Sequence, residues 1–210
     1  NVRGAQSRVL PYQGDSIPVY FGGSSGEAIV VAGEQADVYA LWGETYEQVR
    51  ETVSRVRAAA EKVGRKTLRF SLSLRPILAD TEDAAWSKAD AILEKARALQ
   101  EKTGYRRSSI ILNEGSRRLL VAAEQGARLD KCLWTSIAAL TGAKGNSTSL
   151  VGTPEQVAEA LLDYYRLGIS TFLIRGFDPL VDAYEYGRDL LPRVRRLIAE
   201  EDQRNGRATA

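Results

Sequence analysis

The sequence predicts an α/β fold with parallel strands, in which about four β/α units form half of a (β/α)₈ barrel. Short apolar runs alternate with amphipathic helical segments along the chain, which is typical of parallel βαβ units. Glycine, serine and threonine stand where these runs give way to helices, as expected of helix N-termini. The predicted strands are about half of those in a closed barrel. An open, doubly wound four-stranded sheet is the alternative architecture.

The first three predicted strands alternate with two helices. Each strand is an apolar run bounded by glycine or a polar turn, and each helix begins near a serine or threonine. Pro76 limits the third strand, because proline cannot donate a hydrogen bond to the ladder. The predicted elements are a strand at 18–21, a helix from 28, a strand at 36–42, a helix at 45–63 and a strand at 68–78.

The rest of the chain is mostly helical. Thr153 followed by Pro154 marks a helix N-terminus, because threonine caps helices and proline suits their first position. The predicted elements are helices at 81–99, 115–125, 129–140, 153–167 and 180–200, a loop at 141–149 and a strand at 171–174. We assign residues 1–201 to one barrel domain and the polar residues 202–210 to a disordered tail.

The composition excludes several classes of function. The formal net charge of +2 gives no case for the basic face that nucleic-acid binding requires. No apolar run approaches the roughly 20 residues of a membrane-spanning helix, and the start of the chain does not resemble a signal peptide. The sequence holds no histidine, which excludes a Ser–His–Asp relay and most zinc sites within this chain. No metal site is predicted.

The single cysteine and the absence of methionine lead to expectations about the redox environment and about the completeness of the chain. The single cysteine, Cys132, cannot form an internal disulfide, which indicates a reduced, cytoplasmic setting. Because Cys132 lies in an apolar segment, we expect a small core side chain rather than a nucleophile. The chain begins at Asn1 and contains no methionine. We therefore expect a fragment that lacks an N-terminal part.

A series of segments follows the order of strands and exits in a known group of barrel enzymes. The segments are 19–25 (VYFGGSS), 34–39 (EQADVY), 42–44 (WGE), 68–70 (LRF), 150–157 (LVGTPEQV) and 167–177 (LGISTFLIRGF). They resemble the fifth to eighth strands of the bacterial luciferase-like flavin-dependent monooxygenases, in particular the alkanesulfonate monooxygenase branch. The resemblance extends over nearly the whole chain.

The resemblance implies a (β/α)₈-barrel monooxygenase. Such an enzyme binds reduced FMN, which a separate flavin reductase supplies, and uses O₂ to oxygenate a small organic substrate. A sulfonate or related organosulfur compound is the implied substrate. The cofactor carries the difficult chemistry while the protein orients it and excludes water. Relatives are often homo-oligomers, so self-association is expected by analogy, and neither nucleic acid nor a membrane is expected as a partner.

The cofactor phosphate is expected at the exit of the first predicted strand. Gly22 and Gly23 permit a tight turn and a close approach of the backbone to a ligand. Ser24 and Ser25 add hydroxyl donors at the N-terminus of the next helix, whose free N–H groups attract anions. The resemblance implies that the anion is the phosphate of FMN. The alternative is an ordinary strand–turn–helix connection with a capping serine.

Aromatic and basic side chains at later strands complete the predicted site. Trp42 ends a strand on the face where barrel enzymes place their chemistry, so it either walls the flavin pocket, as a cofactor-binding residue, or belongs to the core. Tyr39, earlier on the same strand, is expected to be a packing residue. Ser73 and Arg75 share one face of the third strand. Related alkanesulfonate enzymes usually have arginine and histidine at these two places, so sulfonate specificity stays open. Arg75 would hold an anion or pair with Asp80.

Two further basic residues are predicted to be catalytic together with Arg75. Lys144 lies in a Gly/Ser/Thr-rich segment that resembles the loop that closes over the active site in this family, where arginine is usual. An exposed linker is the alternative. Arg175 follows the last strand and would contact the substrate or pair with Asp178. Phe177 stands where relatives often have a tyrosine, so that hydroxyl is missing here.

Two other functions stay open from the sequence. A deazaflavin (F420)-dependent oxidoreductase would use the same barrel, although the Gly-Gly-Ser-Ser strand exit favours the FMN branch. A non-catalytic half-barrel is the third possibility, because a fold does not determine a function. Such a half-barrel would expose an unpaired sheet edge and associate with itself or with an N-terminal half.

Overall fold

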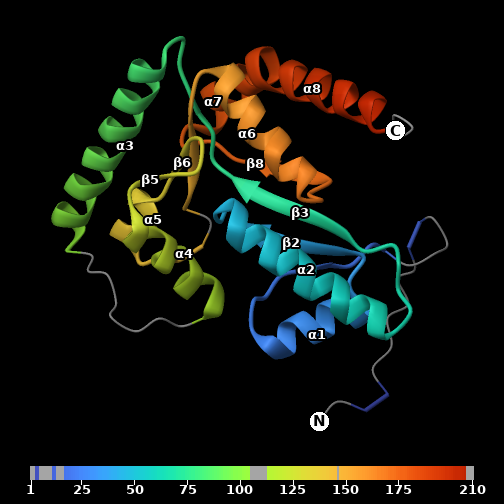
Figure 1. The fold of residues 1–210 in the computed structure, drawn as a ribbon. Coiled ribbons are helices and arrows are strands. Elements are labelled where there is room, and N and C mark those ends of the chain that lie inside the picture. The colour runs from blue at the N-terminus through green and yellow to red at the C-terminus, as the bar shows by residue number, and fades with distance from the viewer. Residues whose placement is uncertain (1–2, 5–10, 13–16, 105–112, 146, 207–210) are drawn as a thin grey trace.

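A parallel sheet of four strands forms the centre of the fold. The computed structural model describes residues 3–4, 11–12, 17–104, 113–145 and 147–206, and Figure 1 shows the arrangement of its elements. The strands follow the order β1-β2-β3-β8, and all neighbours are parallel. They are β1 (Tyr20–Phe21), β2 (Val38–Trp42), β3 (Arg69–Leu74) and β8 (Thr171–Ile174). The four strands confirm the predicted parallel β/α pattern.

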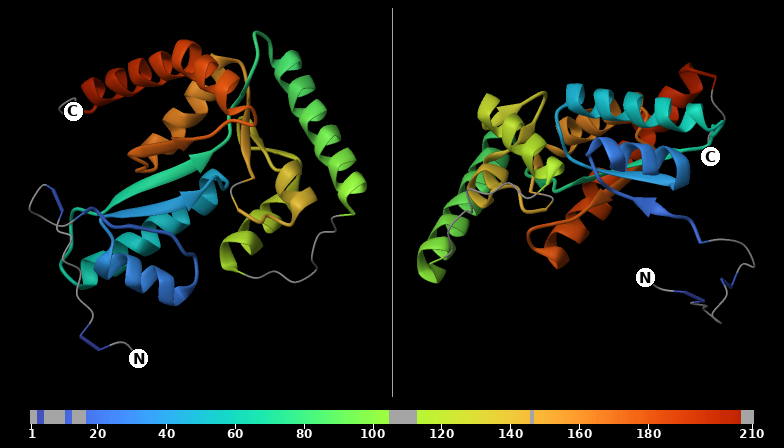
Figure 2. Two further views of the ribbon diagram at one scale, coloured as in Figure 1. Left: turned by 180° about the vertical axis from the view of Figure 1, so that it is seen from behind. Right: turned by 90° about the horizontal axis from the view of Figure 1, so that it is seen from below.

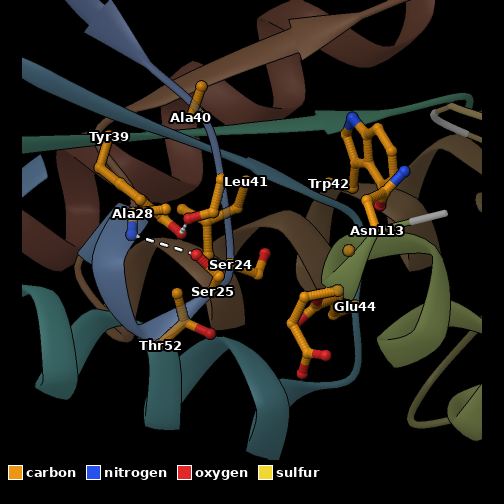
Figure 3. A pocket seen from close by; sticks show the side chains of 14 residues that line it. Ser24, Ser25, Ala28, Tyr39, Ala40, Leu41, Trp42, Glu44, Thr52 and Asn113 are labelled. Carbon is orange, nitrogen blue, oxygen red and sulfur yellow. Dashed lines mark hydrogen bonds between the residues drawn. The ribbon is translucent and has the colours of Figure 1, made fainter. Parts of the chain in front are cut away.

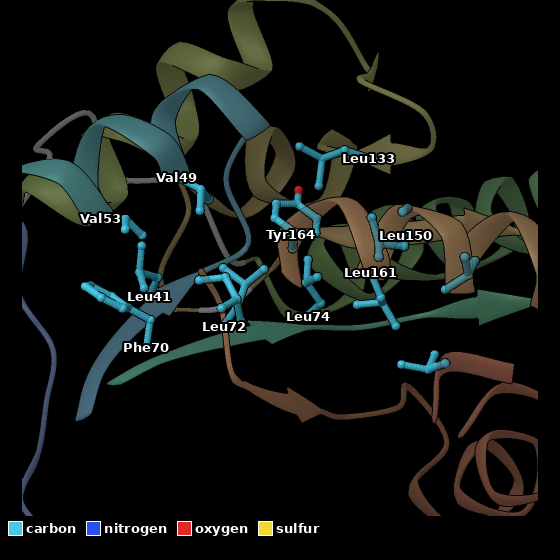
Figure 4. Packing of buried hydrophobic residues seen from close by; sticks show 14 of the residues in the cluster. Leu41, Val49, Val53, Phe70, Leu72, Leu74, Leu133, Leu150, Leu161 and Tyr164 are labelled. Carbon is cyan, nitrogen blue, oxygen red and sulfur yellow. The ribbon is translucent and has the colours of Figure 1, made fainter. Parts of the chain in front are cut away.

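Helices cover one face of this sheet. Alternate residues of β3, namely Phe70, Leu72 and Leu74, are buried and pack with apolar side chains of the covering helices (Figure 4). These helices include α1 (Gly26–Gln35), α2 (Tyr46–Lys62) and α6 (Pro154–Arg166). Because side chains alternate along a strand, the intervening residues point to the opposite face. Along β3, the apolar core therefore lies on the face that the helices cover.

The predicted helix starts at Thr45 and Thr153 are confirmed. Each threonine side chain accepts a hydrogen bond from the backbone N–H three residues later, and each threonine backbone N–H donates to the side chain of Gln48 or Gln156. These reciprocal contacts are capping boxes. They satisfy N–H groups that lack partners inside the helix, and so they fix where each helix begins.

The opposite face of the sheet carries residues predicted to form the site. Trp42 lies beside Ser73 in the β2–β3 pair, and Ser73 lies beside Leu173 in the β3–β8 pair. These three side chains therefore share one face. Leu173 is 53% exposed, and Tyr20 on the other edge strand is 57% exposed. Within the described part of the chain, no layer covers this face at the two edge strands.

A helical insertion with a small sheet of its own lies between β3 and β8. Figure 2 shows the insertion helices to one side of the main sheet in both views. Its strands, in the order β4-β7-β6-β5, are β4 (Ile77–Leu78), β5 (Arg128–Leu129), β6 (Leu133–Trp134) and β7 (Ser149–Gly152). Its helices are α3 (Glu82–Thr103), α4 (Glu114–Gln125) and α5 (Ser136–Thr141). The predicted helices at 81–99 and 115–125 are thus confirmed.

Two predictions inside the insertion are wrong. The segment 129–140, predicted to be one helix, begins with the antiparallel hairpin β5–β6, in which Asp130 adopts a φ of 48° at the turn. Strand β7 begins at Ser149, which we expected to be the last residue of a loop, and continues through residues that we had assigned to no element. Leu133 pairs with Leu150 across β6 and β7, and both are buried. This long-range pairing outweighs the local helical pattern.

The C-terminal helix is longer than predicted and contains a π-helical turn. Helix α7 (Pro179–Glu185) continues through η1 (Tyr186–Leu190) into α8 (Leu191–Arg204), whereas the predicted helix ended near residue 200. Tyr165 Oη donates to Asp202 Oδ1 at 2.6 Å and holds this end against α6. Residues 207–210 of the predicted tail lie outside the described residues. No described helix is both long enough and apolar enough to cross a membrane.

Candidate functional site

A cavity of about 640 Å³ opens at the carboxyl ends of β1 and β2 (Figure 3). Its volume lies within the usual range for small-molecule and cofactor sites. The lining residues are Gly22, Gly23, Ser24, Ser25, Ala28, Tyr39, Ala40, Leu41, Trp42, Glu44, Thr52, Asn113, Glu114 and Gly115. The structure therefore brings five of the six predicted cofactor residues to one cavity and leaves out Ser73.

The turn after β1 is held close to its neighbours. A Cβ atom on Gly22 would lie 3.3 Å from the carbonyl oxygen of Ala40, and one on Gly23 would lie 2.9 Å from Ala28 Cβ. Larger residues would therefore push the turn away from β2 and α1. Tyr39, predicted to be a packing residue, is buried and its hydroxyl donates to the Gly23 carbonyl at 2.6 Å. Tyr39 thus packs and also fixes the turn.

The N-terminus of α1 stabilises negative charge. Ser25 Oγ accepts a hydrogen bond from the backbone N–H of Ala28 at 3.2 Å, so the capping role of this serine is confirmed. The pKa of the Glu27 carboxyl is lowered by a hydrogen bond from its own backbone N–H and then by the Ser25 hydroxyl. Free N–H groups and the helix dipole explain this preference for an anion.

Helix α4 supplies a wall of the cavity that the sequence analysis missed. Asn113 caps this helix by accepting from the backbone N–H of Ser116 at 2.8 Å. Gly115 lies so close to Trp42 that a Cβ atom there would be 3.2 Å from the indole Cζ3. Asparagine followed by Glu114 and Gly115 could have indicated a helix N-terminus, but nothing local could reveal what this helix faces.

A buried ion pair joins this wall to the exit of β2. The side chains of Glu44 and Arg118 are only 5% and 8% exposed, and Arg118 Nη2 lies 2.9 Å from Glu44 Oε2. Burial raises the pKa of Glu44, and the hydrogen bonds from Arg118 act in the opposite direction. Glu44 belongs to the segment 42–44 that resembles the family, but the sequence predicted no role for it in the site. The two partners are 74 residues apart, so sequence reasoning could not join them.

Two of the three predicted basic residues, Arg75 and Arg175, lie elsewhere, at the ends of β3 and β8. Arg75 Nη1 donates to the Gly176 carbonyl at 2.7 Å, and its guanidinium carbon lies 5.3 Å from the ring centroid of Phe177. This distance permits a cation–π contact. Burial lowers the pKa of Arg75, and the positive charge of Arg175 lowers it further. Ser73 on β3 precedes Arg75 by two residues and pairs with the cavity residue Trp42 on β2. It therefore lies between the arginines and the cavity.

The loop that carries Lys144 is attached to its surroundings on both sides. Ser116 Oγ of α4 donates to the Ala143 carbonyl at 2.8 Å, and Thr148 Oγ1 donates to the Gly43 carbonyl at 2.6 Å. Lys144 is thereby placed between α4 and the exit of β2. The described lining of the cavity does not include Ser73, Arg75, Lys144 or Arg175.

Cys132 lies in the turn of the β5–β6 hairpin rather than in a helix, and it is buried. Burial raises the pKa of its thiol to about 12, so the thiol is protonated at neutral pH. This agrees with the expected role as a core side chain. Across the described ranges, no three His, Cys, Asp or Glu side chains gather in a way that could hold a metal ion.

A parallel β/α sheet with a ligand-sized cavity at the carboxyl ends of its strands is the arrangement found in (β/α)₈-barrel proteins. A family model described as "Luciferase-like monooxygenase" matches residues 1–171, which is most of the chain. The chain belongs to the luciferase-like monooxygenase family.

Solved structures share this fold. A riboflavin lyase (RcaE), solved with modified FMN and riboflavin, has a TM-score of 0.61 at 19% identity over 90% of this chain and 43% of that chain. DmoA from Hyphomicrobium sulfonivorans has a TM-score of 0.60 at 20% identity over 90% and 42%. The F420-dependent tetrahydromethanopterin reductase from Methanopyrus kandleri has a TM-score of 0.54 at 17% identity over 87% and 52%. The chain spans less than half the length of the first two, and it carries about half of a luciferase-like barrel.

Proposed function

We propose that this chain forms the phosphate-binding side of the active site in a flavin-dependent monooxygenase. The enzyme would use reduced FMN, supplied by a flavin reductase, and O₂ to oxygenate a small organic substrate. One observation carries the proposal: the turn at 22–25, the N-terminus of α1 and Trp42 meet at one cavity in a chain of the luciferase-like family.

The residues at this cavity fit an FMN molecule. The Ser24 and Ser25 hydroxyls and the N–H groups at the start of α1 would hold the phosphate. Leu41 and Trp42 offer apolar and aromatic surface to the flavin ring. Glu27 uses the same donors, so its carboxylate must turn away when a phosphate binds. When bound, reduced FMN supplies the electrons that activate O₂, while the protein orients the ring and excludes water.

We assign an anionic substrate, such as a sulfonate or a related organosulfur compound, to the second group of residues. Arg75 and Arg175 bring two positive charges together at the ends of β3 and β8. A nearby anion would offset their mutual repulsion. Lys144, in the loop attached to the exit of β2, would complete the positive environment. These three side chains would bind and orient the substrate.

A deazaflavin-dependent oxidoreductase is the second candidate. The F420-dependent reductase from Methanopyrus kandleri shares the fold with a TM-score of 0.54, and the same helix N-terminus would suit the phosphate of either cofactor. Parallel titrations with reduced FMN and reduced F420 separate the two. Tighter binding of F420 would replace the monooxygenase proposal with the oxidoreductase.

The test of the phosphate site is an anaerobic titration of the purified chain with reduced FMN, followed by flavin fluorescence. Reduced riboflavin is titrated in parallel, because it lacks the phosphate. The double variant Ser24→Ala/Ser25→Asp keeps a capping residue but adds a negative charge where the phosphate would lie. We expect FMN affinity to fall about tenfold and riboflavin affinity to change little.

The matched control is Ser54→Ala/Ser87→Asp, which makes the same changes at two exposed helix positions. It should leave both affinities unchanged. An equal loss of FMN and riboflavin binding in the Ser24/Ser25 variant would show that the turn does not hold the phosphate. Absence of saturable FMN binding by the folded wild-type chain would remove the proposal for this chain.

A further inference from the structure

We propose that the buried Arg118–Glu44 pair is the positioning device of the cavity. It fixes α4 as one wall and thereby sets how closely Gly115 approaches Trp42. The inference deepens the proposed function and rests on it for the identity of the ligand, since this wall would face the flavin. Arg118 lies outside the described cavity lining, so it acts through its helix and is a positioning residue.

The guanidinium group of Arg118 is held from several directions. Its Nε donates to both carboxylate oxygens of Glu44 at 3.0 Å, and its Nη2 donates to Glu44 Oε2 at 2.9 Å. Its Nη1 donates to Glu51 Oε2 at 2.9 Å, and Nη2 also donates to Thr52 Oγ1 at 3.2 Å. In return, Gln48 Nε2 donates to the Arg118 carbonyl at 3.0 Å. The planar fork of arginine suits this set of partners, whereas a lysine ammonium cannot reproduce it.

These partners join α4 to the elements that build the cavity. Glu44 follows β2 closely and Thr52 lies on α2, and both side chains line the cavity. Arg118 follows Gly115 by about one helical turn, so its position determines where the cavity-lining start of α4 lies. Figure 3 shows Trp42, Asn113 and Glu44 together at the end of the cavity away from Tyr39.

The apolar contacts of α4 mainly hold it to the rest of the insertion. Leu119 and Leu120 cluster with Ala138 and Ala143, and Trp42 packs against this cluster. The polar contacts of Arg118 therefore provide the link between α4 and α2. A buried charge that loses its partner is strongly unfavourable. Removal of the guanidinium group would consequently release the start of α4 from the cavity and leave Trp42 without its neighbour.

Fluorine NMR can follow this wall directly. The chain contains three tryptophans, so 5-fluorotryptophan labelling gives one signal for each, and Trp42→Phe assigns the signal of interest. In Arg118→Lys and Arg118→Met we expect the Trp42 signal to shift while those of Trp86 and Trp134 stay in place. We also expect the affinity for reduced FMN to fall about tenfold or more.

Arg97→Met is the matched control, because Arg97 is an exposed arginine that pairs with Glu94 within α3. Neither the Trp42 signal nor FMN affinity should change in this variant. A Trp42 signal that does not move in folded Arg118→Lys and Arg118→Met would overturn the proposal.

Gly115→Ala provides a second, independent test, since it leaves the ion pair intact and favours helix formation. Its methyl group would press on the indole of Trp42, so we expect the same signal to shift and FMN affinity to fall. If the Arg118 variants unfold, all three fluorine signals collapse together and Gly115→Ala decides: an unmoved Trp42 signal then rejects the proposal. If the wild-type chain binds no flavin, the proposed function fails, while the fluorine signals still decide on the positioning of α4.

Discussion

Single residues at the cavity act through partners that are distant in the sequence. Tyr39 shows this for the glycine turn, because its ring is part of the core while its hydroxyl donates to the Gly23 carbonyl. Burial raises the pKa of Tyr39. The hydroxyl therefore stays protonated, and remains a donor, throughout the neutral range. Local pattern predicted the packing role of this tyrosine, whereas the hydrogen bond required the strand register.

Tyr39→Phe tests the contribution of this hydrogen bond. The substitution keeps the ring but removes the donor, and a typical hydrogen bond contributes about 1 kcal/mol. We expect unfolding in urea to occur at a lower concentration and FMN affinity to fall, because the turn at 22–25 loses a restraint. Tyr20→Phe, at an exposed tyrosine on the same sheet, is the control. Unchanged stability and affinity in Tyr39→Phe would show that the turn holds itself.

Cys132 leads to a prediction about pH. Its pKa is raised from 9.0 to about 12 by burial. The unfolded chain therefore loses this proton before the folded chain does. The buried, protonated thiol therefore makes its full contribution to the stability of the folded chain below pH 9. This contribution is lost as the pH rises toward 12. We expect a thiol reagent to modify Cys132 only as fast as the chain opens, and Cys132→Ala to reduce the fall of stability above pH 9. Rapid labelling of the folded chain would contradict this.

At the scale of elements, the sequence predicts best where one segment carries its own signals. The helices that begin at Thr45 and Thr153 have capping boxes, and they begin where predicted. The hairpin β5–β6 was missed because it depends on the pairing of Leu133 with Leu150, which lies in another strand. The wall formed by α4 was missed for the same physical reason. Its position depends on Arg118, whose partners lie on other elements.

The exit of β2 shows how tightly elements pack around the cavity. A Cβ atom on Gly43 would collide with the side chain of Leu74 and lie 2.7 Å from Thr148 Oγ1. Overpacking of this kind costs about 1–3 kcal/mol, so we expect Gly43→Ala to lower the melting temperature by several degrees. In Gly187→Ala the added methyl group meets nothing within 4 Å, and helix propensity favours alanine. Gly187→Ala should melt at the same temperature as the wild type or higher. An unchanged melting temperature of Gly43→Ala would contradict the packing argument.

At the scale of the whole molecule, the four-stranded sheet has an unpaired strand edge on each of its two sides in the described part of the chain. Strands β1 and β8 each have one neighbour among the described strands, whereas a (β/α)₈ barrel closes with eight. Unpaired strand edges and exposed apolar side chains favour association with another chain. A second copy related by a twofold axis along the strands would place β8 of each copy beside β1 of the other. All eight strands would then be parallel, as in the barrel of this family.

We therefore expect the chain, expressed alone, to self-associate through these edges, with a light-scattering mass that rises with concentration. Tyr20→Lys/Leu173→Lys places charges at two exposed positions on the uncovered face and should shift the chain toward the monomer. Leu99→Lys/Val63→Lys makes the same changes at exposed apolar positions on α3 and just after α2, and it should not. A stable wild-type monomer at all concentrations would reject the expectation. Association that survives the Tyr20/Leu173 variant would place the contact on another surface, because charged side chains at a sheet edge oppose strand pairing.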